Sequence, residues 1–548
     1  MSASSKKKLR SAEQAAKMTE RQLAEQKEAK KLKLYTTVFV VVLVALLAIA
    51  IGFGINNVIS GNGAKERNTV AVTAGTHEIS NAEMNYYFID ELWNMYSGEY
   101  GYLMQLGLLD TTQPLSAQSC VFGDGTQTWA DYLLQQATGN IQAIYAMVDA
   151  ANAAGYTMPQ KYQDAVTSTM DSMKIQALSN GYPDLDTYLK AQYGNGAAED
   201  SYRSYMESRV LAQAYYYEYA NNLTFEDADL RALESEDYNA FTSYDYNYYF
   251  VTASKFNQGG VEGEDGTVTY SDEEIAAGIA AAEEAAKALT SDEITSVEAF
   301  DNAISQLSIN AESETAVTST VYEDLLYTGI TVAPIAEWLS EGNHVAGEKA
   351  YFPSETTTDG VTTVTGYYVI YLADVDENLR EVYSVRHILA SFQGGTADET
   401  TGETVYSDEE KAAALTEAEA LLAEWKAGEA TEASFAELAN LKSSDGDGTT
   451  GGLYKYVGLN TGFVEPFENW AADEARQVGD TEIVESVYGY HVMYFVGNSG
   501  RTYRDVLIES TLAATAVSDW QAELIAATPI TEGDTSYVLT NLVLSAGY

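Results

Sequence analysis

Two short apolar runs typical of β-strands, each with a histidine at its centre, enclose one stretch of the chain. The first is Val385–Leu389 around His387, and the second is Tyr488–Met493 around His491. Between them the periodicity predicts two helices and then a glycine-rich loop at 443–452. The predicted order is therefore strand with histidine, helix, helix, glycine loop, strand with histidine.

The first helix of this stretch has a strong start signal. Ser407 is followed three residues later by Glu410, the capping-box pattern that opens many helices, and Gly428 is placed to end the helix. Helical spacing predicts an apolar face made of Leu415, Ala418, Leu422 and Trp425. The next helix is predicted to pack through Phe435, Leu438 and Ala439.

The chain upstream is predicted to be mainly helical. A short strand at Val70–Ala74 precedes a helix that Ser80 and Glu83 begin as a second capping box. Its apolar face is predicted to consist of Met84, Phe88, Leu92 and Met95. This region is rich in tyrosine, which fits either core packing or exposed aromatic side chains that grip unfolded polypeptides.

Further helices are expected on both sides of the histidine stretch. One runs from about Thr128 to Ala154, others extend to about Asn221, and Thr224 is expected to start one at Asp227–Ser235. Near the C-terminus, Tyr503–Leu524 is predicted to be a helix followed by a tail.

Residues 244–372 mirror residues 383–495, which predicts a duplicated domain. The matched segments are Thr269–Glu274 with Val405–Glu410, and Gly366–Tyr371 with Gly489–Tyr494; Pro334, Trp338 and Gly347 match Pro466, Trp470 and Gly479 at one constant offset. In the first copy, Tyr248 and Tyr368 stand where the second copy has histidine. The first copy is therefore expected to lack the chemistry of the second.

An almost wholly apolar run, Thr36–Ile55, follows a basic N-terminal segment. About twenty helical residues at about 1.5 Å each span about 30 Å, the thickness of a bilayer core. Because basic flanks stay in the cytoplasm, the bulk of the chain is expected outside it. A cleaved signal peptide is the alternative, but its apolar region is usually about 7–15 residues with a short basic lead. The pattern favours an uncleaved anchor.

The charge balance excludes one class of partner. The chain of 548 residues has a net charge of −51, of which residues 1–33 contribute +6 through ten Lys or Arg and four Glu, so residues 34–548 carry −57. Nucleic acid needs a basic surface and is not expected as a partner. The acidic surface predicts either steering of basic clients or simple solubility.

The residues that hold metals or form disulfides are scarce. The one cysteine, Cys120, excludes an internal disulfide, and the four histidines show no metal-ligand spacing. No metal or other cofactor is expected.

In the order and spacing of its motifs, the stretch 383–497 resembles a parvulin-type peptidyl-prolyl cis/trans isomerase domain. The resemblance implies that the first and last strands are sheet neighbours, so that His387 and His491 form a hydrogen-bonded pair beneath the substrate. It also implies an acidic residue opposite them, either Asp445 or Asp447, and a small hydroxyl residue, Ser486, near the second histidine.

The same resemblance implies a pocket for the proline ring lined by Leu453, Phe463 and Phe467. Phe463 stands where many family members have methionine, and the usual Gly-Gly-Asp-Leu-Gly run is shortened to Gly451–Tyr454. The implied activity is rotation about X–Pro bonds without a cofactor, with His387, Asp445 and His491 as catalytic residues.

With the repeat, the resemblance implies an α+β chain similar to PrsA-type and SurA-type extracytoplasmic foldases. We expect a helical chaperone lobe and two tandem parvulin-like domains, each a small antiparallel sheet with flanking helices, after a single transmembrane helix. The expected divisions are a basic cytoplasmic tail (1–33), the transmembrane helix (34–58), the helical chaperone-like domain (68–237), a degenerate parvulin-like domain (240–377), the isomerase domain (380–498) and a C-terminal helix and tail (500–548).

The implied function is a foldase of the cell membrane that isomerises X–Pro bonds in unfolded or partly folded secreted polypeptides. It would cross the membrane once, with a cytoplasmic N-terminus and an extracytoplasmic bulk. Two alternatives stay open: a non-enzymatic holdase in which both parvulin copies are inactive, and a surface-binding or spacer protein. The histidine pair favours the enzyme, because a spacer needs no such pair.

Overall fold

The computed structural model describes residues 63–97, 107–122, 125–263, 266–311, 313, 315–358, 360–397, 404–446 and 450–544. Within these residues the chain forms two compact units, one of 63–224 with 512–544 and one of 225–511. The predicted cytoplasmic tail and transmembrane helix, residues 1–58, lie outside the described part. No helix within the described ranges is long and apolar enough to cross a membrane.

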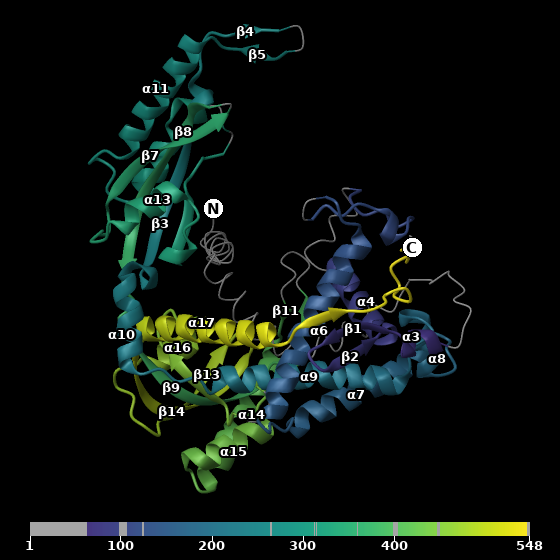
Figure 1. Cartoon of the computed structure of the whole chain (residues 1–548). Coiled ribbons are helices and arrows are strands. Elements are labelled where there is room, and N and C mark those ends of the chain that lie inside the picture. Colours follow the sequence, from purple (N-terminus) through teal and green to yellow (C-terminus); the bar gives the residue numbers. More distant parts are fainter. Residues whose placement is uncertain are drawn as a thin grey trace. The chain divides into compact units, whose positions relative to one another are not determined.

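A three-stranded antiparallel sheet organises the first unit (Figure 1). Its order is β15-β1-β2, with β1 at Val70–Ala74, β2 at His77–Ser80 and β15 at Ile530–Glu532. Val72 on β1 lies opposite Glu532 on β15. The C-terminal segment thus returns to complete a sheet that the N-terminal segment begins.

Helices pack around this sheet and bury a large apolar core. They are α3 (Ala64–Asn68), α4 (Asn81–Ser97), α6 (Trp129–Ala153), α7 (Gln160–Ser179), α8 (Leu185–Tyr193) and α9 (Glu199–Asn221), with one turn of 3₁₀ helix, η1 (Leu115–Ala117). The predicted apolar face of α4 is buried, and the Glu83 N–H donates to Ser80 Oγ at 3.2 Å, which confirms the serine half of the predicted capping box. Tyr86 and Tyr202 are buried edge to face at 5.1 Å, so these tyrosines are core residues.

Two helices lie where the chain passes from one unit to the other. The long helix α17 (Tyr503–Ala527) has its first residues in the second unit and the remainder in the first, where Trp520 stacks on Tyr219 at 3.7 Å. Helix α10 (Asp227–Glu236) begins at Glu226, whose N–H donates to the Asp229 carboxylate at 2.9 Å. The prediction that Thr224 starts this helix is wrong, because a carboxylate three residues beyond Glu226 satisfies the helix start instead.

Two four-stranded antiparallel sheets in the second unit share one strand order (Figure 1). The first is β6-β3-β8-β7, with β3 at Ser243–Thr252, β6 at Thr320–Leu326, β7 at Lys349–Thr358 and β8 at Val361–Asp376. The second is β12-β9-β14-β13, with β9 at Glu381–Ser391, β12 at Leu453–Val457, β13 at Thr481–Ser486 and β14 at Gly489–Thr502. Tyr248 lies opposite Ile370, and His387 lies opposite Met493, in the register that the repeat aligns.

The connections after β3 and β9 also correspond. Each passes through a two-stranded hairpin to a helix and then a second helix: β4 (Val261–Glu262), β5 (Val268–Thr269), α11 (Asp272–Leu289) and α12 (Val297–Ser305) in the first, and β10 (Thr396–Ala397), β11 (Thr404–Val405), α14 (Asp408–Ala427) and α15 (Glu432–Lys442) in the second. Later come α13 (Ala333–Ser340) and α16 (Glu465–Ala471), each with proline in its first turn.

A glycine and a glutamate meet in the same way at the start of both longer helices. A Cβ atom on Gly259 would lie 2.2 Å from Glu274 Oε1, and one on Gly394 would lie 2.2 Å from Glu410 Oε1. Both glutamates also accept their helix's capping-box bonds from a serine. These glycines, with φ of 89° and 83°, leave room for the carboxylate that closes the box.

Helices α14 and α15 cover one face of the second sheet, and α16 lies on the other. The buried residues of α14 are Ala414, Ala418, Leu421 and Trp425, while Leu415 and Leu422 are half-buried. The predicted apolar face is therefore right for Ala418 and Trp425, whereas Ala414 and Leu421 are buried where Leu415 and Leu422 were predicted. An alanine-rich helix offers several apolar faces, and small Ala414 and Ala418 let this one approach the sheet closely.

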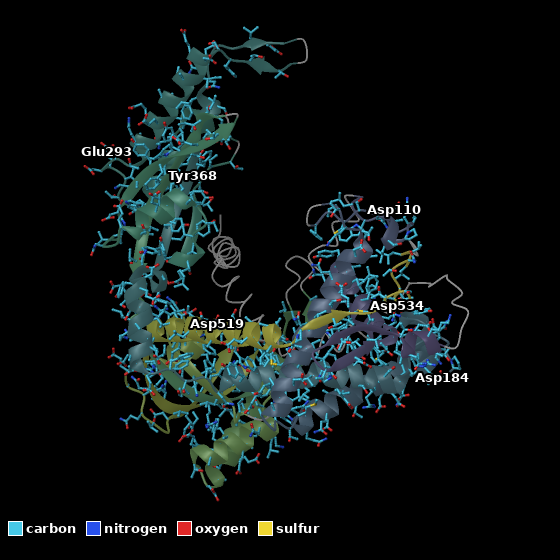
Figure 2. All side chains as sticks on the ribbon, in the orientation of Figure 1. Asp110, Asp184, Glu293, Tyr368, Asp519 and Asp534 are labelled. Atoms are coloured by element: carbon cyan, nitrogen blue, oxygen red, sulfur yellow. The ribbon has the colours of Figure 1, made fainter. Side chains whose placement is uncertain are left out.

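In the first sheet, aromatic rings fill the places that correspond to the two histidines. The Tyr248 ring lies 6.2 Å from Tyr368, which is labelled in Figure 2, and 5.9 Å from Tyr322. These rings are half-buried. The corresponding face of the second sheet carries the pair of histidines.

Asp245 on β3 is a part-buried carboxylate beside other acids. It accepts the Asp324 N–H, and burial, together with Asp324, Asp374 and Glu323, raises its pKa to about 6. An unfolded aspartate has a pKa of about 3.9. Protonation therefore stabilises the fold, an effect fully present below about pH 4 and lost as the pH rises through 6.

We predict that Asp245→Asn raises the melting temperature by a few degrees at pH 8 and by little at pH 4. The amide keeps an oxygen for the Asp324 N–H but carries no charge. Thermal unfolding at both pH values checks this, with Asp292→Asn, at an exposed position of the same copy, as the control. An equal shift at both pH values for Asp245→Asn contradicts the prediction.

Candidate functional site

The central strands β9 and β14 bring the two histidines together. His387 lies opposite Met493 and His491 lies opposite Leu389, so both point to the same face of the sheet on adjacent strands. Their Nδ1 atoms are 2.9 Å apart and their rings stack with centroids 5.1 Å apart. The two side chains are buried, with residue exposures of 2% and 4%. The pairing implied by the family resemblance is thus present in the fold.

The loop after α15 places an acid beside this pair. Ser443 Oγ accepts the N–H groups of Leu389 at 3.1 Å and Asp445 at 3.2 Å, which fixes the loop against β9. Asp445 Oδ2 then lies 3.2 Å from His387 Nε2 and accepts the Tyr454 hydroxyl at 2.9 Å. Of the two acidic candidates, Asp445 makes the contact; Asp447 lies outside the described residues.

Ser486 holds the other end of the pair. It is the last residue of β13, and its Oγ lies 2.7 Å from His491 Nε2. The same oxygen accepts the Tyr488 N–H at 3.1 Å. Five side chains therefore form one hydrogen-bonded row, here called the polar line: Tyr454, Asp445, His387, His491 and Ser486.

The direction of each bond in the polar line follows from the acid. An ionised carboxylate only accepts, so His387 Nε2 donates to Asp445, and with a neutral imidazole its Nδ1 then accepts. His491 Nδ1 then donates to it, and His491 Nε2 accepts the Ser486 hydroxyl. Both imidazoles are neutral in this arrangement, and all four ring nitrogens have a partner.

Electrostatics agree with a neutral His491. Burial, reinforced by His387 and opposed by Asp445, lowers the pKa of His491 to about 3. Burial and the Asp445 carboxylate raise the pKa of the Tyr454 hydroxyl, so that this group keeps its proton. Among the described residues no three His, Cys, Asp or Glu side chains are grouped to hold a metal ion.

Three aromatic rings cover the polar line. Phe467 on α16 lies edge-on to His387 at 5.3 Å and to His491 at 5.5 Å. Phe463 stacks on Phe467 at 5.5 Å, and Tyr454 meets the edge of Phe463 at 5.4 Å. Phe467 is buried and Phe463 is half-buried. The site is thus an apolar aromatic wall above a hydrogen-bonded polar floor.

A buried carboxylate shapes the loop that carries Phe463. Glu468 accepts the N–H groups of Asn460 at 2.9 Å, Thr461 at 2.8 Å and Phe463 at 2.9 Å. Burial raises the pKa of Glu468, and these backbone donors oppose the rise. The position of the Phe463 ring therefore depends on one side chain in the first turn of α16.

The predicted site residues do not all come together. His387, His491, Asp445, Ser486, Phe463 and Phe467 meet at one place. Leu453 lies opposite Arg386 and so faces away from the histidines, whereas Tyr454 lies opposite Val385 and faces them. Tyr454 was missed in the sequence, although strand alternation after Gly452 is a signal that separates it from Leu453. Glu468 was also missed, because no periodic pattern in the sequence marks a side chain that binds loop backbone N–H groups.

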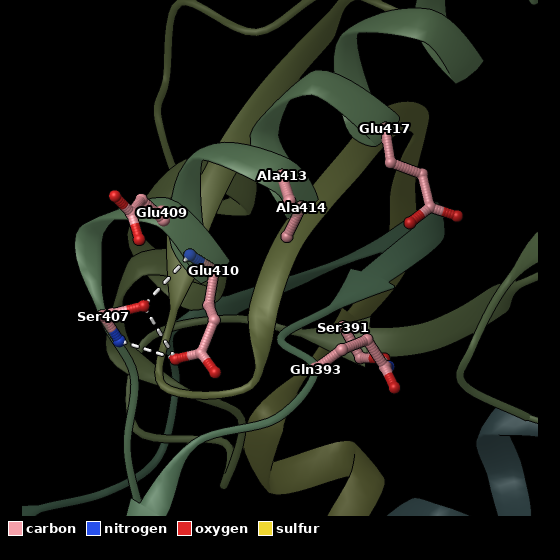
Figure 3. A pocket seen from close by; sticks show the side chains of 8 residues that line it. All are labelled: Ser391, Gln393, Ser407, Glu409, Glu410, Ala413, Ala414 and Glu417. Carbon is pink, nitrogen blue, oxygen red and sulfur yellow. Dashed lines mark hydrogen bonds between the residues drawn. The ribbon is translucent and has the colours of Figure 1, made fainter.

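A hollow of about 460 Å³ lies elsewhere, at the start of α14 (Figure 3). Its lining is Ser391, Gln393, Ser407, Glu409, Glu410, Ala413, Ala414 and Glu417. The Glu410 carboxylate there is already engaged by the Ser407 N–H and hydroxyl and by the Gly395 N–H. None of the predicted site residues lines this hollow. It lies beside the capping contacts of Ser407 and Glu410 at the start of the helix.

Comparison with known proteins identifies the domain around the polar line. Residues 367–497 match the family described as the PPIC-type PPIASE domain, so the chain carries a parvulin-type peptidyl-prolyl isomerase domain. The match begins within β8, before the predicted domain start at 380. No curated protein matches the chain.

Two crystal structures of peptidylprolyl isomerases named PrsA are also similar to part of the chain. The protein from Bacillus anthracis is 20% identical, with a TM-score of 0.17, over 28% of this chain and 59% of its own. The protein from Bacillus cereus is 22% identical, with a TM-score of 0.16, over 27% of this chain and 49% of its own. This chain therefore covers less than two thirds of either protein.

We predict that folding stability falls as the pH drops from about 6.5 towards 3, in part through His491. Its folded pKa of about 3 lies below the ordinary value near 6.5, so the unfolded state binds the proton first and gains from acid. Chemical denaturation across this range, with NMR of the imidazole, checks the claim. In His491→Gln the same pH range should cost less stability than in the wild type. If the His491 imidazole becomes charged near pH 6.5 in the folded protein, the lowered pKa of His491 is wrong.

Proposed function

We propose that this chain is a membrane-anchored, extracytoplasmic peptidyl-prolyl cis/trans isomerase that assists the folding of secreted proteins. The observation that carries the proposal is the polar line beneath Phe463 and Phe467, inside a matched PPIC-type domain. The clients we propose are unfolded or partly folded secreted polypeptides that contain X–Pro bonds. His387, Asp445 and His491 are the proposed catalytic residues, and Phe463, Phe467 and Ser486 contribute to the substrate site.

The chemistry requires little more than this arrangement. The X–Pro bond turns slowly because of its partial double-bond character, with a barrier of about 18–20 kcal/mol. The twisted transition state loses amide resonance, and its carbonyl sweeps through a new direction. An aromatic wall that holds the proline ring and excludes water favours that state, and fixed dipoles beneath can follow the carbonyl.

The polar line suits this task because its side chains are fixed by hydrogen bonds to one another. Each ring nitrogen already has a partner, so the histidines have no vacant position from which to attack the substrate. Asp445 fixes the tautomer of His387, and His387 in turn fixes that of His491. These residues are proposed to set the polarity under the bond that turns, with no covalent intermediate.

The first sheet supports a second element of the proposal. Residues 240–377 have the strand order, register and helix-start contacts of the second copy, but Tyr248 and Tyr368 replace its histidines. We propose a degenerate parvulin-like domain that does not isomerise. The helical lobe at 68–237 is proposed to be the chaperone-like domain.

We predict that His387→Ala and His491→Ala each lower the isomerisation rate of a proline peptide at least about tenfold, because each removes a fixed dipole beneath the bond that turns. Asp445→Ala should lower it less, because the histidine pair remains. The full chain is assayed, and each variant is also melted, since a half-bonded buried imidazole costs about 1–3 kcal/mol. Tyr248→Ala and Tyr368→Ala, at the matching positions of the first copy, serve as controls and should keep the rate.

The paired measurement separates chemistry from folding. A lower rate with little change in melting supports the catalytic assignment. Folded histidine variants with full rates would rule it out and leave a holdase or a spacer as the function.

We predict that the protein stays in the membrane fraction and that protease added to intact protoplasts digests residues 60–548. The support is the apolar run Thr36–Ile55 with basic residues ahead of it. Recovery of a processed soluble form that starts near residue 60 contradicts the anchor and favours a cleaved signal peptide.

A further inference from the structure

We infer that Arg380 is a positioning residue for the proline pocket, held in place by Asp376 of the neighbouring copy. The inference rests on the proposed isomerase function. Arg380 lies in the short link between β8, which ends at Asp376, and β9, which begins at Glu381. It is outside the polar line and outside the aromatic wall.

The Arg380 guanidinium donates hydrogen bonds to the backbone of the loop that carries Phe463. Its Nε donates to the Leu459 carbonyl, and its Nη2 donates to the Asn460 carbonyl at 2.9 Å. Glu468 holds the N–H groups of the same loop. The loop backbone is therefore clamped through its carbonyls on one side and its N–H groups on the other.

The guanidinium is itself fixed by the link between the copies. Nη1 donates to the Asp376 carboxylate and to Asn378 Oδ1, the latter at 2.8 Å. The group also lies 4.4 Å above the Tyr503 ring at the start of α17. An arginine held by a carboxylate, an amide and a ring has little freedom, and its planar fork can direct two bonds at once.

Asn378 makes the link rigid in turn. It is fully buried with φ of 58°, and its Nδ2 donates to the Phe241 carbonyl at 2.9 Å and Ser243 Oγ at 3.0 Å. The Arg504 N–H donates to the Asn378 carbonyl at 2.7 Å. Through Asp376 and Asn378, residues of the non-catalytic copy and its link thus orient the side chain that clamps the pocket loop.

Phe463 is a half-buried ring of the aromatic wall, and its position depends on the loop that carries it. Loss of the carbonyl clamp should let the ring move away from Phe467, while the buried polar line stays as it is. Such a change weakens substrate positioning and appears mainly in KM, with kcat and the pH profile nearly unchanged.

The test uses the full chain and steady-state kinetics on a proline peptide. Arg380→Met keeps the aliphatic stem and should raise KM about three- to tenfold, with kcat within about twofold. Arg380→Lys should recover part of the loss, because charge returns without the fork. Asp376→Asn should change KM in the same direction by a smaller factor.

Arg476→Met is the matched control. Arg476 also donates through Nε to a backbone carbonyl, that of Trp470 at 3.1 Å, and its guanidinium also lies over an aromatic ring, at 4.3 Å. Both of these Arg476 contacts are with Trp470 and neither is with the loop 458–463. Arg476→Met should therefore leave KM unchanged, even if the melting temperature changes. A KM change as large as that of Arg380→Met would overturn the inference.

A double-mutant cycle tests whether the KM change of Arg380→Met arises through Phe463. If Arg380 acts through the Phe463 loop, Arg380→Met should change KM far less in a Phe463→Ala background than in the wild type. An undiminished effect in that background, or an unchanged KM in folded Arg380→Met, overturns the inference. Arg380→Lys and Asp376→Asn carry the test if Arg380→Met does not fold.

Amide hydrogen exchange separates this inference from the proposed function. In Arg380→Met the N–H groups of Asn460, Thr461 and Phe463 should exchange faster, a readout that needs no catalysis. A wild-type chain without isomerase activity refutes the proposed function, while faster exchange still upholds the clamp. Unchanged exchange refutes the clamp whatever the activity.

Discussion

The hydrogen bond between His387 and His491 depends on a single backbone constraint, the antiparallel pairing of β9 and β14. That pairing joins the two ends of the isomerase stretch and sets which side chains share a face. Were the register to slip by one residue, every side chain of β14 would move to the other face. The row of hydrogen bonds from Asp445 to Ser486 depends on this one register.

The same pairing in the first copy shows how much of the fold is independent of the chemistry. Tyr248 and Tyr368 occupy the histidine positions without changing strand order or register. Packing therefore does not require imidazole at these places. What the second copy adds is a set of groups whose hydrogen bonds converge on Asp445, from Tyr454 on one side and from Ser486 through the two histidines on the other. The catalytic proposal draws its strength from that difference between two similar frames.

Sequence patterns predicted the parts of the site that lie on regular elements. The strands with His387 and His491, the capping box at Ser407 and the helix at Phe435 follow from periodicity and local caps. The side of the sheet on which Leu453 lies depends on its register with Arg386, which periodicity alone does not give. The roles of Arg380 and Glu468 depend on bonds to loop backbone, and such bonds leave no repeating pattern in a sequence.

The strand β15 has a consequence for the order in which this protein is made. The first lobe cannot finish its sheet until the last segment of the chain is available to pair with β1. During synthesis the edge of β1 that β15 later covers remains unpaired, and closing so long a loop costs chain entropy. The first lobe of this protein can therefore complete its folding only late in synthesis. The sheet of the first lobe becomes complete only after the isomerase domain has been synthesised.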